Sequence, residues 1–305
     1  MDMRATINQL SVLFILLALG YVGSKFNVLT ADSGKVLTKL VLNITLPGTI
    51  LGSVIGGGIS IDGAETAFFM LFVLLAFFVC LVIAHPTARI LTKDKSMRSL
   101  LASCVIFGNV VFMGLPVATA VLGDHAVFYV TLFNIPFWIA VFSYGALLVS
   151  GKSGSFHPKL LLNPVLISSV LVIPIAMSGF RAHDIIVDAL QIAGSITTPA
   201  SMIIIGVTLS QIPIKRVFTK WQLYPIALVK LIVVPVLVWL IFRSFITNET
   251  MLGVLVILSA MPTASLIAMF AIEYDNNATT ASSAVFLTTL LSGITIPLIV
   301  FLLLS

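Results

Sequence analysis

The chain has 305 residues, of which 59% are apolar and only 9% are charged. Soluble domains are about 25% charged, so this composition excludes a soluble domain and indicates several membrane-spanning helices. The net charge of +5 does not indicate a nucleic-acid binder, because the Lys and Arg residues lie between the apolar runs. The two cysteines, Cys80 and Cys104, both lie inside apolar runs, which excludes a disulfide framework and a cysteine-based metal site.

Apolar runs separated by charged or turn-forming residues predict ten membrane-spanning helices. A bilayer core about 30 Å thick needs roughly 20 apolar residues per helix, and the runs are close to that length. The predicted spans cover residues 6–24, 36–57, 66–88, 99–122, 126–149, 160–179, 185–210, 220–242, 250–272 and 278–304. The connections are short, so the sequence predicts an all-α membrane protein without a soluble domain of ordinary size.

The positions of the Lys and Arg residues predict the orientation of these spans. The connections on one side hold most of them, namely Lys25, Lys35, Lys39, Arg89, Lys93, Lys95, Arg98, Lys152, Lys159, Lys215, Arg216 and Lys220. The other side holds Arg4, Arg181 and Arg243, while Lys230 lies within a span. Because positively charged loops stay in the cytoplasm, we expect a multi-pass protein of the cytoplasmic membrane with both termini outside.

A polar, glycine-rich connection divides the chain into two halves of five spans. It covers residues 151–159 on the cytoplasmic side, between a first half at 1–150 and a second half at 160–305. Because five is an odd number, a second copy of the first half would cross the membrane in the opposite direction, as in transporters with inverted repeats. Pro47 and Pro199 occupy similar places in spans two and seven, which favours such a repeat.

Two predicted spans contain residues that interrupt a helix. Span four has the segment 108–116 (GNVVFMGLP), and span nine has 259–265 (SAMPTAS). Pro and Gly free backbone groups that lipid cannot satisfy, so such segments occur where they are buried in protein or line a wet cavity. If both helices are broken and cross, two helix N-termini meet near the membrane centre, where they can hold a carboxylate. An ordinary proline kink is the alternative at each position.

Lys230 is placed near the middle of span eight. A charge in hydrocarbon costs at least about 2.5–3.5 kcal/mol, so we expect Lys230 to face protein or water, with the C-terminal ends of the broken helices as its partner. The sequence leaves open whether Lys230 acts electrostatically or changes protonation during a reaction cycle. Neutral oxygens that could bind sodium are carried by Asn43, Thr197, Thr198 and Ser265, although such groups more often bond to nearby backbone carbonyls.

Several short motifs, spread over nearly the whole chain, resemble the auxin efflux carrier (PIN-like) family. They are Gly20-Tyr21 with Lys25, 43–47 (NITLP), 108–116, 163–166 (NPVL), 261–264 (MPTA), and Glu273-Tyr274 with Thr288-Thr289. The GNVVFMGLP segment is the most specific of them. The resemblance implies ten helices in two inverted five-helix repeats, a scaffold domain, and a transporter domain with crossed, broken helices four and nine. It also implies an elevator-like movement and an anionic substrate at the crossing.

The resemblance further implies that Asn109 contacts the substrate carboxylate and that Pro116 and Pro262 break their helices. The expected substrate-binding residues are Gly108, Asn109, Gly114, Pro116, Pro262 and Thr263. Bacterial members of the family look like carriers of small organic acids, which implies a secondary transporter of carboxylates such as malate or malonate. The chain lacks the long central hydrophilic loop of the plant members.

Other functional classes fit the sequence less well. No HExxH or GxSxG motif occurs and no pair of carboxylates lies within a span, so we expect no enzyme, no metal and no cofactor. A channel-like or cation-exchanging protein on the same architecture is the alternative, although an exchanger would be expected to carry an acidic pair in the membrane. The expected partners are a small carboxylate and the lipid bilayer, without nucleic acid. Sodium or proton coupling, the identity of the acid and a homodimer stay open.

Overall fold

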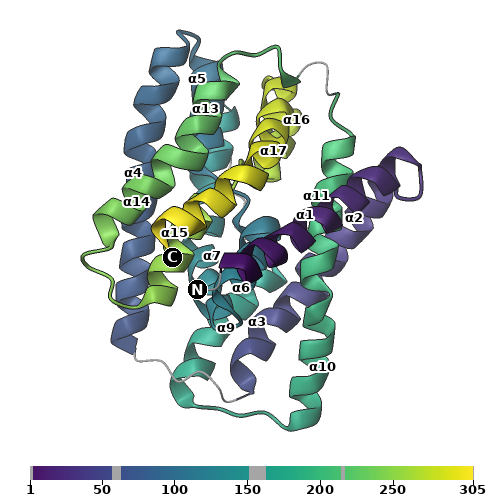
Figure 1. Ribbon diagram of the computed structural model, residues 1–305, viewed down its shortest axis with the longest axis vertical. Coiled ribbons are helices and arrows are strands. Elements are labelled where there is room, and N and C mark those ends of the chain that lie inside the picture. The colour runs from purple at the N-terminus through teal and green to yellow at the C-terminus, as the bar shows by residue number, and fades with distance from the viewer. Residues whose placement is uncertain (1–2, 57–62, 151–162, 214–216, 305) are drawn as a thin grey trace.

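A computed structural model of the chain describes residues 3–56, 63–150, 163–213 and 217–304. Every regular element in these residues is a helix (Figure 1). One isolated β-bridge joins Gly108 to Thr263. The linker predicted at 151–159 lies outside the described residues. The all-helical structure is the one that the apolar composition predicted, because an isolated helix satisfies its own backbone groups in lipid.

Seven helical segments among the described residues are long and apolar enough to cross a membrane. They are Thr6–Lys25, Ala31–Ile55, Gly63–Leu91, Ala126–Ser150, Asp184–Ser210, Leu223–Phe242 and Ala278–Leu303. Shorter apolar helices cover Val110–Leu122, Pro164–Ser178 and Glu249–Ser259. All of them fall on spans predicted from the sequence, and the chain is a multi-pass membrane protein. Two of the shorter helices are short because spans four and nine are interrupted.

One group of helices, which we call the panel, combines elements from both halves of the chain. Its members are α1 (Met3–Lys25), α2 (Ala31–Leu40), α3 (Leu46–Ile55), α9 (Pro164–Ser178), α10 (Asp184–Ser195) and α11 (Thr197–Ser210). Within it, α1 and α2 pack against α11, and α3 packs against α9 and α10 (Figure 1). The panel therefore pairs the beginning of the first half with the beginning of the second.

The remaining helices form a second group, which we call the crossing bundle. Its members are α4 (Gly63–Leu91), α5 (Lys95–Ile106), α6 (Leu115–Leu122), α7 (Ala126–Ala140), α8 (Ala146–Ser150), α13 (Leu223–Leu228), α14 (Val234–Phe242), α15 (Glu249–Ser259), α16 (Ser265–Glu273) and α17 (Ala278–Leu303). Here α4 packs against α5, α14 against α15, and α16 against α17 (Figure 1). Both interrupted spans belong to this bundle.

The helices of the panel approach each other through glycines. A Cβ atom added at Gly206 would lie 2.1 Å from the carbonyl oxygen of Leu17, and one added at Gly20 would lie 2.4 Å from that of Ile203. These distances are far shorter than a van der Waals contact, so only glycine permits the crossing of α1 and α11. Small residues commonly allow such backbone contact in membranes, where packing rather than the hydrophobic effect holds helices together.

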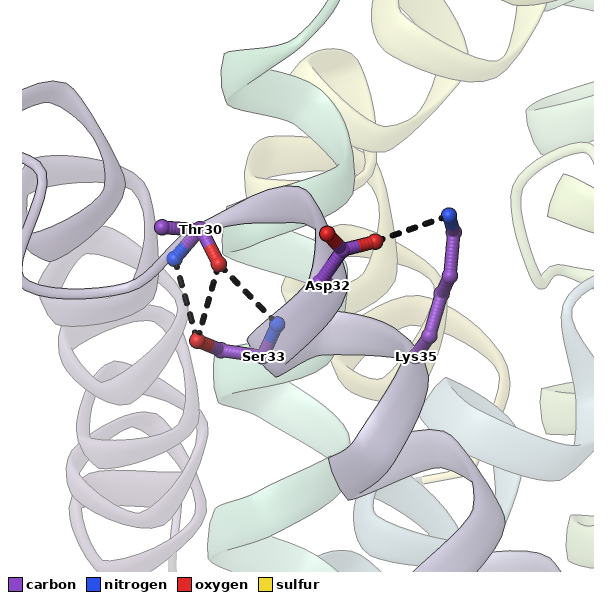
Figure 2. A network of polar contacts seen from close by, with 4 residues as sticks. All are labelled: Thr30, Asp32, Ser33 and Lys35. Atoms are coloured by element: carbon purple, nitrogen blue, oxygen red, sulfur yellow. Dashed lines mark hydrogen bonds and ion pairs between the residues drawn. The ribbon is translucent and has the colours of Figure 1, made fainter.

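The start of α2 is fixed by a reciprocal cap, shown in Figure 2. The Ser33 N–H donates to Oγ1 of Thr30 at 3.2 Å, and the Thr30 N–H donates to Oγ of Ser33 at 3.2 Å. The two bonds satisfy N–H groups that a helix start leaves unpaired. An exposed ion pair between Asp32 and Lys35, with 2.9 Å between Nζ and Oδ1, lies on the first turn.

Among the described residues, four membrane helices contain a π-turn, and in three of them a proline follows shortly after it. The π-turns are η1 (Val41–Thr45), η2 (Val110–Gly114), η3 (Val141–Gly145) and η5 (Val229–Val233). Pro47, Pro116 and Pro235 are each the second residue of the helix that follows η1, η2 and η5. Proline lacks an N–H and clashes with the preceding turn of an ordinary helix, so a wider turn accommodates it.

Candidate functional site

The two interrupted spans are broken at the same place in the bundle. In span four, α5 ends at Ile106 and η2 begins at Val110. In span nine, α15 ends at Ser259 and α16 begins at Ser265. The residues between these ends are extended or irregular, and the backbone groups there must find partners outside their own helix.

The two breaks satisfy each other's backbone groups. The Asn109 N–H donates to the carbonyl oxygen of Pro262 at 2.7 Å, and the Ala264 N–H donates to that of Phe107 at 2.9 Å. These bonds flank the antiparallel β-bridge between residues 108 and 263. The pairing holds the starts of η2 and α16 beside each other, so two helix N-termini lie at one crossing.

Lys230 lies at this crossing. It belongs to η5 and is 1% exposed, which is the burial of a residue that faces protein rather than lipid. A Cβ atom added at Gly108 would lie 3.2 Å from Nζ of Lys230 and 3.3 Å from Cβ of Met261, so glycine leaves the space that the lysine needs. Lys230, Cys80 and Ser259 line a cavity of about 20 Å³, which is enough for about one water molecule.

The surroundings of Lys230 contain helix C-termini. Ile106 and Leu258, from the last turns of α5 and α15, line the same small cavity. Neither of the two ion pairs between described residues involves Lys230. Because helix C-termini carry partial negative charge, these two ends are placed to offset the ammonium group. The ammonium group of Lys230 thus lies beside the partially negative C-termini of α5 and α15 and close to the partially positive N-termini of η2 and α16.

Thr263 connects three elements of the bundle. Its hydroxyl donates to the carbonyl oxygen of Cys104 at 2.9 Å, and its N–H donates to Oγ1 of Thr288 on α17 at 3.1 Å. The residue is fully buried. The Cys104 carbonyl is in the last turn of α5 and lacks a partner within that helix. Thr263 was expected to bind the substrate. In the structure its hydroxyl is used for the hydrogen bond to the end of α5.

Asn109 is buried at the start of η2. Its carbonyl accepts from the N–H groups of Met113 and Gly114, at 3.3 and 3.0 Å, and begins the π-turn. Its side-chain amide does not cap the helix that follows. A Cβ atom added at Gly114 would lie 2.6 Å from Cδ2 of Leu258, so Gly114 lets η2 approach α15. Gly108 and Gly114 therefore position the site through their small size.

Pro116 and Pro262, which were both expected to break a helix, occupy different kinds of backbone. Pro262 lies within the break of span nine and accepts the Asn109 bond. Pro116 does not break its helix: the backbone break of span four lies at 107–109, and Pro116 follows the intact turn η2. The expected role of Pro116 is corrected here, because the π-turn absorbs the proline and the helix continues through it.

Two larger cavities lie between the panel and the bundle. The α6 cavity, of about 570 Å³, is lined by Thr49 of α3, Thr119 of α6 and Gln191 of α10, among others. The α16 cavity, of about 390 Å³, is lined by Ile204 of α11 and Ser265 of α16, among others. Helices α3 and α10 lie toward one end of the molecule and α16 toward the other (Figure 1).

The residues expected to offer oxygens to sodium are not brought together. Asn43 is exposed and bonds to a carbonyl of its own helix. Thr197 is buried and donates to Oγ1 of Thr45 at 3.0 Å. Thr198 lines the α6 cavity, whereas Ser265 lines the α16 cavity. These four oxygens therefore do not form one coordination site.

Two residues that line the α16 cavity were not expected from the sequence. Phe112 of η2 and Ser283 of α17 both line the α16 cavity, together with Ser265. A signal for Ser283 was present, since hydroxyl residues cluster at 279–283 (TTASS) near the start of the last span. That cluster resembles the many hydroxyls that only bond to their own helix, so the sequence did not distinguish it.

A multi-pass helical chain with two paired helix breaks, a buried lysine and cavities between two groups of helices has the features of a membrane transport protein. The sequence profile of the membrane transport protein family matches residues 5–159 and 153–300. The chain belongs to this family, which is the auxin efflux carrier-like family that its motifs resemble.

Two archaeal relatives match almost the entire chain. An uncharacterized transporter of Methanocaldococcus jannaschii is 24% identical over 301 residues, which cover 94% of this chain and 95% of the relative. An uncharacterized transporter of Methanothermobacter thermautotrophicus is 25% identical over 299 residues, which cover 97% of each chain. Both relatives are similar to this chain over both of its halves.

Proposed function

We propose that this protein is a secondary transporter of small organic anions, carboxylates such as malate or malonate, across the cytoplasmic membrane. The observation that carries the proposal is the pair of helix N-termini at the crossing, where η2 begins at Val110 and α16 begins at Ser265. The first N–H groups of a helix have no partner within it and carry partial positive charge. Two such ends beside each other suit a carboxylate.

Two side chains complete the proposed site. Asn109 offers its amide to the carboxylate, because it directly precedes η2 and does not cap that helix. Lys230 offsets the negative ends of α5 and α15 and keeps the crossing positive overall. Substrate release requires that binding be reversible, and neutral hydrogen-bond donors provide that more readily than a second buried cation would.

We further propose that transport follows an elevator-type movement. The panel is the scaffold, because α1 and α11 are in backbone contact at Gly20 and Gly206. The crossing bundle is the moving part, since both breaks belong to it. The α6 and α16 cavities lie along the seam between the two groups, and sliding along this seam would open them alternately.

The proposed architecture has ten spans as two inverted repeats, at 1–150 and 160–305, with both termini outside. A contact within the panel supports the repeat. Thr45 and Thr197 each lie two residues before a proline in corresponding helices, and their hydroxyls hydrogen-bond to each other at 3.0 Å. Contact between equivalent residues is expected at a pseudo-two-fold axis between inverted repeats.

The orientation can be tested by labelling single cysteines in a cysteine-free variant. Ser153→Cys and Thr219→Cys should resist a membrane-impermeant thiol reagent applied outside intact cells, because both positions belong to connections on the positively charged side. Gly63→Cys should react. The opposite pattern would overturn the orientation, and labelling at all three positions would overturn the ten-span arrangement.

The function is tested by uptake of labelled mono- and dicarboxylates into proteoliposomes, with sodium and proton gradients imposed separately. We expect saturable carboxylate uptake, with the gradient that stimulates it identifying the coupling ion. A cation exchanger would move sodium or protons without any carboxylate.

A further inference from the structure

Ser283 is a buried hydroxyl without a hydrogen-bond partner among the described residues. It lies on α17 and is 1% exposed. Other serines in these helices donate to a carbonyl of the preceding turn, as Ser292 does to Thr289 at 2.7 Å and Ser259 does to Val256 at 2.8 Å. A buried donor left unpaired is unfavourable and calls for an explanation.

The position of Ser283 suggests what its partner is. Ser283 lines the α16 cavity, and so do Phe112 and Ser265, which belong to the first turns of η2 and α16. Ser283 and the first turns of both half-helices therefore lie in the wall of one cavity of about 390 Å³. The other atoms that are buried without a partner belong to residues that do not line this cavity.

We propose that Ser283 donates its hydroxyl to the carboxylate of the transported anion in the α16 cavity. The inference rests on the proposed function and adds to it a ligand from α17. An O–H group bonded to a carboxylate makes a short, charge-assisted hydrogen bond, which would satisfy the unpaired donor. The hydrocarbon part of the anion lies against Ile204 and Ile205 of the panel, which line the same cavity.

The first test compares two serine variants of the same helix. Ser283→Ala should raise the apparent KM for labelled malonate in proteoliposomes about tenfold, because one hydrogen bond to a charged group is lost. The control is Ser292→Ala, whose hydroxyl is equally buried but already bonded to Thr289 and lies outside the cavity. Equal KM values for the two variants would overturn the proposal.

The second test does not depend on the alanine variant's transport. Ser283→Cys should react with a small methanethiosulfonate reagent, and malonate should slow the labelling whereas chloride should not. The unsubstituted protein is the control, because neither Cys80 nor Cys104 lines the α16 cavity. Labelling at a rate that malonate does not change would overturn the proposal. Absence of any carboxylate uptake by the unsubstituted protein would instead overturn the proposed function.

The placement against the two isoleucines is tested with linear monocarboxylates as competitors of malonate uptake. Each added CH2 that contacts Ile204 and Ile205 should strengthen competition by up to about fourfold until the cavity is filled. Competition that weakens from the first added CH2 onward would place the remainder of the anion elsewhere in the cavity.

Discussion

The panel and the crossing bundle use small residues for different purposes. In the panel, Gly20 and Gly206 bring two continuous helices into backbone contact. In the bundle, Gly108 lies where two helices stop, and their freed backbone groups pair across the gap. The first arrangement leaves no helix end inside the protein, whereas the second leaves four. Only the second can offer charge to a ligand, so rigidity and binding are divided between the two groups.

The largest effect is expected from filling the contact between α1 and α11. Gly206→Ala would place a methyl group 2.1 Å from a backbone oxygen, which cannot move without displacing the helix. We expect a loss of more than about 3 kcal/mol and little folded protein by size-exclusion chromatography.

Gly23→Ala is the matched control on α1, because its nearest neighbour would be the Leu29 side chain at 3.5 Å. This variant should keep the melting temperature of the unsubstituted protein. A Gly206→Ala protein with normal yield and melting temperature would show that the panel is not the rigid part.

Lys230→Met should lower both stability and transport. The substitution leaves the ends of α5 and α15 without an ammonium group, at a cost of about 1–2 kcal/mol. Lys230→Arg retains the charge and should retain stability and substantial transport. The checks are a melting curve and pH-dependent flux in liposomes for each variant. A stable but inactive Lys230→Arg protein would contradict the electrostatic role and indicate a change of protonation, since arginine stays protonated.

Asn109→Ala should weaken the apparent affinity for the carboxylate without loss of folded protein. A hydrogen bond to a charged group contributes about 1.5–3 kcal/mol, which corresponds to a roughly 10- to 150-fold rise in KM. Asn43→Ala is the control, because Asn43 is exposed on the panel. If both variants transport like the unsubstituted protein, Asn109 does not contact the substrate.

The smallest effect is expected at the start of α2. Thr30→Ala removes the hydroxyl that accepts the Ser33 N–H, while the bond from the N–H of residue 30 to Ser33 can stay, and should cost about 1 kcal/mol, seen as a lower melting temperature. Asp32→Asn removes only an exposed ion pair and should leave the melting temperature unchanged. Neither variant should change the KM for a carboxylate. A changed KM would show that this edge of the panel takes part in transport.

The sequence predicted the features that depend on composition and local pattern. Apolar runs located the helices, and the Gly and Pro clusters at 108–116 and 259–265 marked both interruptions. The sequence did not predict the exact position of the break within the first cluster. The helix continues through Pro116 because the π-turn η2, with one additional residue per turn, accommodates the proline. A π-turn depends on packing around the helix, and the order of residues does not reveal it.

The side chains around the site were less predictable than the breaks. The approach of Lys230 to Gly108 joins residues far apart in the chain and follows from the way η5 packs beside the crossing. Asn43 carries a suitable oxygen but faces outward, since its place on the helix surface sets its direction. Ser283 differs from Ser292 in lacking a bond to its own helix and in lining the α16 cavity, and the order of residues reveals neither difference.

The most direct test of the account is counterflow of labelled malonate into proteoliposomes loaded with unlabelled malonate, without a sodium or proton gradient. Alternating access to a carboxylate site predicts that the label accumulates transiently inside the liposomes. Unlabelled carboxylates outside should inhibit this accumulation. The Asn109→Ala protein should need a higher malonate concentration to show it. Folded protein that shows no counterflow with any of the mono- and dicarboxylates tested, while it conducts sodium or protons, would contradict the proposed site and its substrate class.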